Sequence, residues 1–234
     1  VLVDSYDCFE QNCVIFNGSI NMAKLVKGDL GPSCSPVLYC NFKNYLCSNY
    51  YSHFGDFLFN DKYVLMSLSE LNRQKFFIYG IFGKEGLIFI RPDSGEKTFQ
   101  AQLVDILDFD RFFNNNKNLQ HELVLISTPK NIKWEGRFIV DGKEIIDYST
   151  YMFQGQVTKI PAVPPESIKF VNKLMQINYC PDSVYCYDIC QDNDGNYYLM
   201  ELTSFSSAGL YECNKDKIVE KVSEIAWRDY NNEK

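Results

Sequence analysis

Two acidic residues on neighbouring predicted strands are the positions of this chain best suited to chemistry. Asp188 and Glu201 each lie in an apolar and aromatic segment, and the Asp194-Gly195 pair between them favours a tight hairpin. A carboxylate drawn into a mostly buried sheet is costly unless a cation or hydrogen bonds compensate its charge. Two such carboxylates on adjacent strands predict a site for a hard divalent metal, most simply magnesium that carries the phosphates of a nucleotide.

Two other interpretations of this hairpin stay open. An EF-hand calcium loop would use Asp192, Asp194 and Glu201 as ligands. Its first place would be Cys190, which is not a hard oxygen ligand, and the flanks favour strands where an EF-hand needs helices. In the second interpretation, Asp188 is an incidental polar residue and Glu201 lies on the solvent-facing side of the hairpin.

A second constellation is a turn that carries two cations. A predicted buried strand ends at Arg91, and a turn with Ser94 and Gly95 then leads to Lys97. Backbone N–H groups in such a turn can cradle phosphate oxygens. Arg91 would neutralise them as a planar fork and Lys97 as a point charge. The sequence is not a Walker A loop, and the alternative is an exposed turn with two solvated cations.

A third constellation begins where a predicted strand breaks at Pro129. Breaking a strand frees backbone groups, which the edge of an adenine ring can use. Glu135 and Arg137 then enter a new strand, where Arg137 could meet a charged substrate or a terminal phosphate. The alternative is an ordinary loop with a surface ion pair.

The composition excludes several classes of function. The chain has 234 residues and a formal charge of −7, so nucleic acid is not an expected partner. No apolar run approaches the ~20 residues that a membrane span needs, and the N-terminal residues do not resemble a signal peptide. Nine cysteines without a C-x-x-C pair indicate reduced thiols in a cytosol-like compartment. The two histidines do not lie at ligand spacing from a cysteine pair, so structural zinc is not supported.

The periodicity of apolar side chains predicts the elements that must position these residues. A strand at 14–16, a Gly-Ser turn and a helix at 20–26 form an α/β unit, and the chain opens abruptly before that strand. Residues 28–60 are irregular and aromatic, and they form either a recognition surface or a closely packed connector. Further helices are expected at 69–80 (with a serine N-cap), 164–175 and 216–227, and further strands at 86–91, 123–126, 137–140, 144–146, 184–190 and 196–203. The last helix carries an apolar stripe of Ile218, Val219, Val222, Ile225 and Ala226.

The three constellations follow one another in an order that resembles the ATP-grasp superfamily. The sequence is most similar to the family, common in phages and bacteria, whose nucleotide site has an arginine and two lysines. The stretches that carry the resemblance are Val14–Ser19, Tyr39–Phe42, Phe89–Gly95 with Lys97, Ser127–Lys130, Glu135–Arg137 and Glu201–Tyr211.

The resemblance implies an α+β ATP-grasp fold, in which two α+β lobes hold ATP and magnesium between them. Residues 1–66 would form a partial N-terminal α/β lobe of the pre-ATP-grasp kind, together with the irregular aromatic loop. Residues 67–234 would form the ATP-grasp domain. Its first lobe and hinge would span 67–130, and its metal-binding lobe would span 131–234.

The resemblance also assigns roles to individual residues. The phosphate contacts would be Arg91, Ser94, Gly95, Lys97 and Lys130. The hinge beside adenine would be Ser127, Thr128 and Lys130, and Glu135 would be a further cofactor-binding residue. The magnesium ligands would be Asp188, Glu201 and Thr203, and Arg137 would be catalytic. Two positions depart from the superfamily, which often has asparagine in place of Thr203 and lysine in place of Arg91. The second change alters the geometry of the contact.

The function implied by the resemblance is an ATP-dependent carboxylate–amine ligase that forms a carbon–nitrogen bond through an acyl phosphate. Its partners would be ATP and an unidentified pair of carboxylate and amine substrates, in the cytoplasm of a bacterial host or a virus-infected cell. A non-catalytic module that binds ATP and magnesium, as a sensor or assembly partner, is the alternative. A nucleic-acid-directed ATP enzyme is a third reading, which the overall acidity disfavours. The sequence leaves the oligomeric state open.

Overall fold

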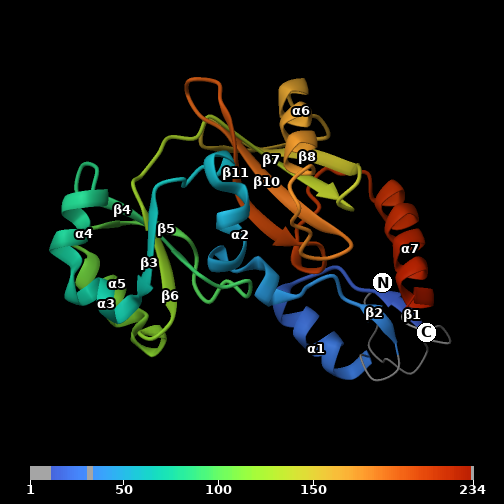
Figure 1. Cartoon of the computed structure of the whole chain (residues 1–234), viewed down its shortest axis with the longest axis horizontal. Coiled ribbons are helices and arrows are strands. Elements are labelled where there is room, and N and C mark those ends of the chain that lie inside the picture. The colour runs from blue at the N-terminus through green and yellow to red at the C-terminus, as the bar shows by residue number, and fades with distance from the viewer. Residues whose placement is uncertain (1–11, 31–33, 233–234) are drawn as a thin grey trace.

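In the computed structural model, the described residues 12–30 and 34–232 place their strands in three sheets (Figure 1). The smallest sheet pairs β1 (Cys13–Ile15) and β2 (Ser35–Val37) in parallel, and α1 (Ile20–Leu30) lies between them in the chain. This arrangement confirms the predicted strand-turn-helix unit, although α1 extends beyond the predicted end.

The first lobe is a four-stranded antiparallel sheet with helices packed against it. The strand order is β3-β6-β4-β5. Its strands are β3 (Tyr63–Ser67), β4 (Leu87–Pro92), β5 (Gln102–Asp105) and β6 (Leu123–Ser127), and its helices are α3 (Leu68–Arg73), α4 (Lys75–Phe82), α5 (Phe109–Asn115) and the 3₁₀ turn η3 (Lys117–Leu119). Apolar side chains from both layers form one core. The sheet therefore begins at Tyr63, ahead of the expected domain boundary at residue 67.

The predicted helix at 69–80 is wrong in its continuity and in its cap. The structure has two helices, α3 and α4, which meet at Gln74. The cap is Ser67, the last residue of β3, whose hydroxyl accepts a hydrogen bond from the N–H of Glu70 at 3.2 Å. A serine in an extended conformation can satisfy a free N–H of the first turn, so the helix begins directly where the strand ends.

The second lobe is a five-stranded antiparallel sheet in the order β11-β10-β7-β8-β9. Its strands are β7 (Trp134–Val140), β8 (Ile145–Phe153), β9 (Gln156–Ile160), β10 (Tyr185–Gln191) and β11 (Tyr197–Ser204), followed by the 3₁₀ turn η4 (Phe205–Ser207). Both predicted hairpins are confirmed, at residues 141–142 and 192–196. Strand β8 runs well beyond its predicted end at 146, and the edge strand β9 was not predicted.

Successive side chains of each strand point to opposite faces of the sheet, so the second lobe has two cores. Phe138, Tyr185 and Tyr187 pack on one face, together with α6 (Pro165–Leu174) and α2 (Cys47–Phe54). Ile139 and Cys186 pack on the opposite face with α7 (Lys215–Asn232). Figure 1 shows α6 above this sheet and α7 at its side.

The segment expected to be irregular, 28–60, contains ordered structure that joins the two lobes. It holds η1 (Phe42–Tyr45), α2 and η2 (Gly55–Phe57), and aromatic side chains of α2 are buried in the second lobe's core. After η2, the N–H of Phe59 donates to the carbonyl of Leu199 in β11, and Asn60 accepts from Ser127 in β6. Of the two open alternatives, the structure supports the closely packed connector.

The last helix confirms most of its predicted apolar stripe. Ile218, Val222, Ile225 and Ala226 are buried, but Val219 is 65% exposed because it points away from the sheet. The predicted helix at 164–175 is confirmed as α6, with Pro165 in its first turn. Among the helices of the described residues, none has the length and apolar character to cross a membrane.

Candidate functional site

Arg137, Asp188 and Glu201 lie directly opposite one another on β7, β10 and β11. Directly opposed residues of antiparallel strands present their side chains on the same face. We call these three residues the carboxylate row. A β-bulge follows Asp188 and leaves Met200 of β11 without a direct partner. Such bulges re-aim side chains and recur beside active sites.

Arg137 and Asp188 form a buried, bidentate ion pair. The Arg137 Nε and Nη2 atoms donate to the two carboxylate oxygens of Asp188 at 2.8 Å each, and Nη1 donates to the carbonyl of Gly209 at 2.9 Å. The Thr203 hydroxyl donates to Asp188 Oδ2 at 2.9 Å. Arg137 and Asp188 are 6% and 2% exposed. Burial alone would raise the pKa of Asp188, but the Arg137 charge and these hydrogen bonds outweigh it and lower that pKa, so the carboxylate is ionised.

Glu201 is held by two cations from the first lobe. Arg91 Nη2 donates to Glu201 Oε1 at 3.0 Å, and Lys97 Nζ lies 3.4 Å from the same oxygen. Arg91 is buried, and its Nη1 also donates to the carbonyl of Met200 at 3.4 Å. Among the described residues, Arg91 Nε is buried without a hydrogen-bond partner. The lobes therefore meet at Glu201, with Arg91 enclosed and the Lys97 side chain half exposed.

The loop after β4 is fastened to the connector. The carboxylate of Asp93 accepts from the N–H of Ser48 at 3.0 Å, and the Ser94 hydroxyl accepts from the N–H of Glu96 at 3.1 Å. A Cβ atom on Gly95 would lie 2.4 Å from the carbonyl oxygen of Phe42. Close packing against backbone thus explains the glycine at position 95.

The Gly95→Ala variant is expected to lower the free energy of unfolding by about 1–3 kcal/mol, because its methyl group collides with backbone that cannot move aside. Urea denaturation measures this change. Gly80→Ala in α4 is the matched control, since a Cβ there has open space and alanine favours a helix. Equal stabilities for the two variants would contradict the close packing.

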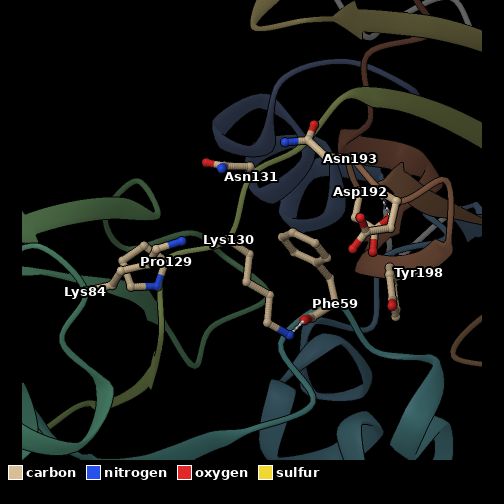
Figure 2. Close-up of a pocket in the computed structure, with 9 residues that line it drawn as sticks. Phe59, Lys84, Pro129, Lys130, Asn131, Asp192, Asn193 and Tyr198 are labelled. Carbon is tan, nitrogen blue, oxygen red and sulfur yellow. Dashed lines mark hydrogen bonds between the residues drawn. The ribbon is translucent and has the colours of Figure 1, made fainter.

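The predicted hinge residues adjoin a pocket of about 360 Å³ (Figure 2). Its lining residues are Phe59, Lys84, Pro129, Lys130, Asn131, Asp192, Asn193, Asp194 and Tyr198. Ser127 is buried and donates to Asn60 at 3.0 Å, while Thr128 is half-buried. Lys130 pairs with Asp61 at 2.6 Å and donates to the Phe59 carbonyl. Its ion pair is thus made beside the predicted hinge and not with the carboxylate row.

Glu135 and two tyrosines border the carboxylate row. Burial raises the pKa of Glu135 and the Asp188 charge adds to this shift, against a hydrogen bond with Tyr151. The rings of Tyr151 and Tyr211 stack with centroids 4.7 Å apart, and Arg137 Cζ lies 5.0 Å from the Tyr211 centroid. Tyr151 is not among the predicted site residues because the predicted strand ends at residue 146, whereas β8 continues to Phe153. An alternating pattern extended to Phe153 would have included it.

The alternative interpretations of the hairpin are not supported. Asp192 braces the turn by accepting from the N–H groups of Asp194 and Asn196 at 3.0 and 2.8 Å, and strands flank it instead of the helices of an EF-hand. Asp188 is buried and paired instead of incidental, and Glu201 faces two cations instead of open solvent.

The donor set fits a magnesium ion that a nucleotide accompanies. Within the described ranges, no three His, Cys, Asp or Glu side chains gather for a metal. Magnesium in nucleotide sites, however, uses one or two carboxylates and completes its shell with phosphates and water. Asp188, Glu201 and the hydroxyl of Thr203 are hard oxygen donors, and each carboxylate oxygen has two lone pairs.

Comparisons of structure find the same fold in characterised proteins. The crystal structure of the D-cycloserine synthetase DcsG matches with a TM-score of 0.60 at 11% identity, over 93% of this chain and 84% of that one. D-alanine--D-alanine ligase from Bacillus anthracis matches with 0.57 at 15% identity, over 84% and 70%. The ATP-grasp ligase PsnB, complexed with a minimal precursor, Mg and ADP, matches with 0.51 at 14% identity, over 88% and 67%. At these identities the similarity shows the fold alone.

Comparisons of sequence identify the family. A search of curated proteins found no match. The family described as ATP-grasp domain, R-2K clade family 2, matches residues 68–221, which is more than half of the chain and includes the carboxylate row and both cations that hold Glu201. The chain therefore has the ATP-grasp fold and belongs to this clade of ATP-grasp domains.

Proposed function

We propose that this protein is an ATP-dependent carboxylate–amine ligase that acts through an acyl phosphate. The observation that carries the proposal is the carboxylate row, which receives two cations from the opposite lobe at Glu201. Negative groups for a metal and positive groups for phosphates thus lie at one place between the lobes. Membership of the ATP-grasp family supports this assignment.

Magnesium would be held by Asp188 and Glu201, with Thr203 in the third position. When bound, the ion neutralises phosphate charge and orients the transferred group. Lys97 has a half-exposed side chain, so its amine can turn from Glu201 to a phosphate oxygen. Arg91 is enclosed, and its guanidinium group donates to the Glu201 carboxylate and to the carbonyl of Met200. It thereby keeps Glu201 in place.

The hinge would hold the nucleotide base. The pocket in Figure 2 includes Lys130, and backbone groups of Ser127, Thr128 and Lys130 would meet the base there. The N–H groups of Ser94 and Gly95 would face phosphate oxygens. Arg91, Lys97 and Lys130 would be the arginine and two lysines of the phage- and bacterium-associated family. Glu135 would contact the nucleotide from its position beside Tyr151 and Asp188.

Arg137 would stabilise the charge that develops during transfer. Asp188 and the Gly209 carbonyl fix the guanidinium before the substrate arrives, and fixed charge of this kind dominates phosphoryl-transfer catalysis. A substrate carboxylate oxygen attacks the terminal phosphorus of ATP and ADP leaves. An amine then attacks the acyl carbon, loses a proton and releases phosphate. These steps would take place in a cytoplasmic compartment of a bacterium or an infected cell.

Glu201→Gln is expected to weaken magnesium-dependent ATP binding by at least about 10-fold, because a neutral amide is a poorer ligand and no longer attracts Arg91 and Lys97. Isothermal titration with and without magnesium measures the change. Glu220→Gln, on the exposed face of α7, is the matched control. Unchanged binding in Glu201→Gln would contradict the assignment of this carboxylate.

One observation favours a non-catalytic module that binds ATP and magnesium. Thr203 stands where the superfamily often has asparagine, and its hydroxyl hydrogen is donated to Asp188, which leaves only the hydroxyl oxygen for the metal. Tight magnesium-dependent ATP binding without ADP formation, across a broad panel of acids and amines, would support the module over the ligase.

A further inference from the structure

Lys159 is a cation on the edge strand β9 that the proposed nucleotide site does not use. Its amine lies 6.0 Å from the centre of the Tyr211 ring, and the side chain is exposed. It takes part in none of the ion pairs formed within the described residues. Aromatic rings attract cations through the negative charge of their faces, so Tyr211 holds this amine without neutralising it.

Tyr211 joins Lys159 to the carboxylate row. The same ring lies 5.0 Å from the guanidinium carbon of Arg137 and stacks on Tyr151 at an interplanar angle of 17°. Two cations therefore border one tyrosine ring. They differ in charge balance, because Asp188 compensates Arg137 and, among the described residues, no carboxylate forms an ion pair with Lys159.

The backbone around this ring is strained. Tyr211 has a φ of +49°, and Lys97 on the other side of the row has a φ of +52°. Left-handed backbone conformations are unfavourable for residues other than glycine. Such strain is most common at binding and catalytic sites, where surrounding contacts impose it. Here the strain places one ring against Arg137, Tyr151 and Lys159.

We propose that Lys159 binds a second anionic group of the carboxylic acid that this enzyme phosphorylates. The reacting carboxylate would lie at the row, beside Arg137, and the body of the acid would cross Tyr151 and Tyr211. Its second anionic group would then meet the uncompensated amine. The substrate class is therefore a dianionic acid, either a dicarboxylate or a phosphorylated carboxylic acid. This inference rests on the ligase function proposed above.

The test compares acids with and without a second anionic group; we call them dianion and monoanion after the number of their anionic groups, whatever cationic group they also carry. Glutarate is paired with its monoamide, glutaramate, and phosphoserine is paired with serine, so that the two pairs distinguish a carboxylate from a phosphate. Equilibrium binding is measured by isothermal titration in the presence of magnesium and the non-hydrolysable analogue AMPPNP. In the wild type, the dianion of at least one pair should bind about 10-fold or more tightly than its monoanion, the scale of one charge-assisted contact.

Variants of Lys159 decide whether this residue causes the preference. Lys159→Gln should remove it while leaving binding of the monoanions unchanged, and Lys159→Arg should retain part of it. Lys173→Gln, which neutralises an exposed lysine on α6, should keep the wild-type preference. A preference that persists in Lys159→Gln would overturn the proposal, as would equal binding of dianion and monoanion to the wild type in both pairs.

Failure of the inference is distinguishable from failure of the proposed function. Absence of AMPPNP binding would refute the nucleotide site, and the acid titrations would then be repeated without nucleotide, because Lys159 and the two tyrosines do not depend on it for their placement. If AMPPNP binds but neither dianion binds the wild type, the nucleotide site stands and the anion site is refuted.

Discussion

Arg137→Met is expected to lower the free energy of unfolding at neutral pH by about 3–5 kcal/mol, the cost of leaving a buried charge without its partner. Asp188 is 2% exposed, and Arg137 supplies two of the three hydrogen bonds that its carboxylate accepts in the structure. Methionine retains an unbranched apolar side chain against the two tyrosines, so the main loss is the charge pair. Urea denaturation measures the difference.

The pH dependence of this variant identifies the cause. In the wild type the pKa of Asp188 lies below its unfolded value of about 3.9, so its ionised form contributes stability at neutral pH, and this is lost as the pH falls through the folded-state pKa. Without Arg137, burial raises the pKa of Asp188. The difference in free energy of unfolding between the wild type and Arg137→Met should therefore become smaller as the pH falls from 7 towards 4.

A double variant provides the control for this experiment. Arg137→Met with Asp188→Asn removes the buried charge together with its partner, so it should be more stable than Arg137→Met alone at neutral pH and its deficit should vary little with pH. If the loss of stability in Arg137→Met stayed constant between pH 7 and 4, the lost interaction would be packing and not charge.

Asp188→Asn is expected to reduce magnesium-dependent turnover of ATP by about 10²–10³-fold, the range seen when one preorganised electrostatic group is removed. The amide carries no charge for the metal, and it cannot accept two charge-assisted hydrogen bonds from Arg137. One substitution would thus weaken the proposed metal site and loosen Arg137, which is proposed to stabilise the transferred phosphoryl group. The measurement is magnesium-dependent ADP release from ATP.

The comparison variant is Asp56→Asn, which makes the same chemical change at an exposed position in η2. It should retain wild-type turnover. Circular dichroism of both variants separates loss of catalysis from loss of folding. If folded Asp188→Asn kept turnover within about 3-fold of the wild type, Asp188 would have no part in the metal site or in orienting Arg137.

The sequence by itself largely determined which strands and turns carry the chemical groups. An Asp-Gly turn between two β-rich segments is a local property, and it correctly placed Asp188 and Glu201 on paired strands. The strand that ends near Arg91 and the strand that breaks before Pro129 were likewise correct. Such predictions depend on apolar alternation and turn residues, which operate over a few neighbours.

Helix α2 shows where local reasoning fails. Residues 47–54 include two tyrosines, an asparagine and a phenylalanine, which are poor helix formers, so the segment was predicted to be irregular. The structure makes it a helix because Tyr50, Tyr51 and Phe54 are buried in the second lobe's core. Short helices gain most of their stability from such tertiary packing, which cannot be derived from propensity.

Only the tertiary structure decided which charged groups meet. Arg137 pairs with Asp188 across 51 residues, and Arg91 pairs with Glu201 across 110, whereas Lys130 pairs with Asp61 beside the predicted hinge. These pairings depend on strand order and register, and a shift of one residue would send each side chain to the other face of the sheet. The chain's residues thus specify the chemical groups, while the packing of the two lobes determines their partners.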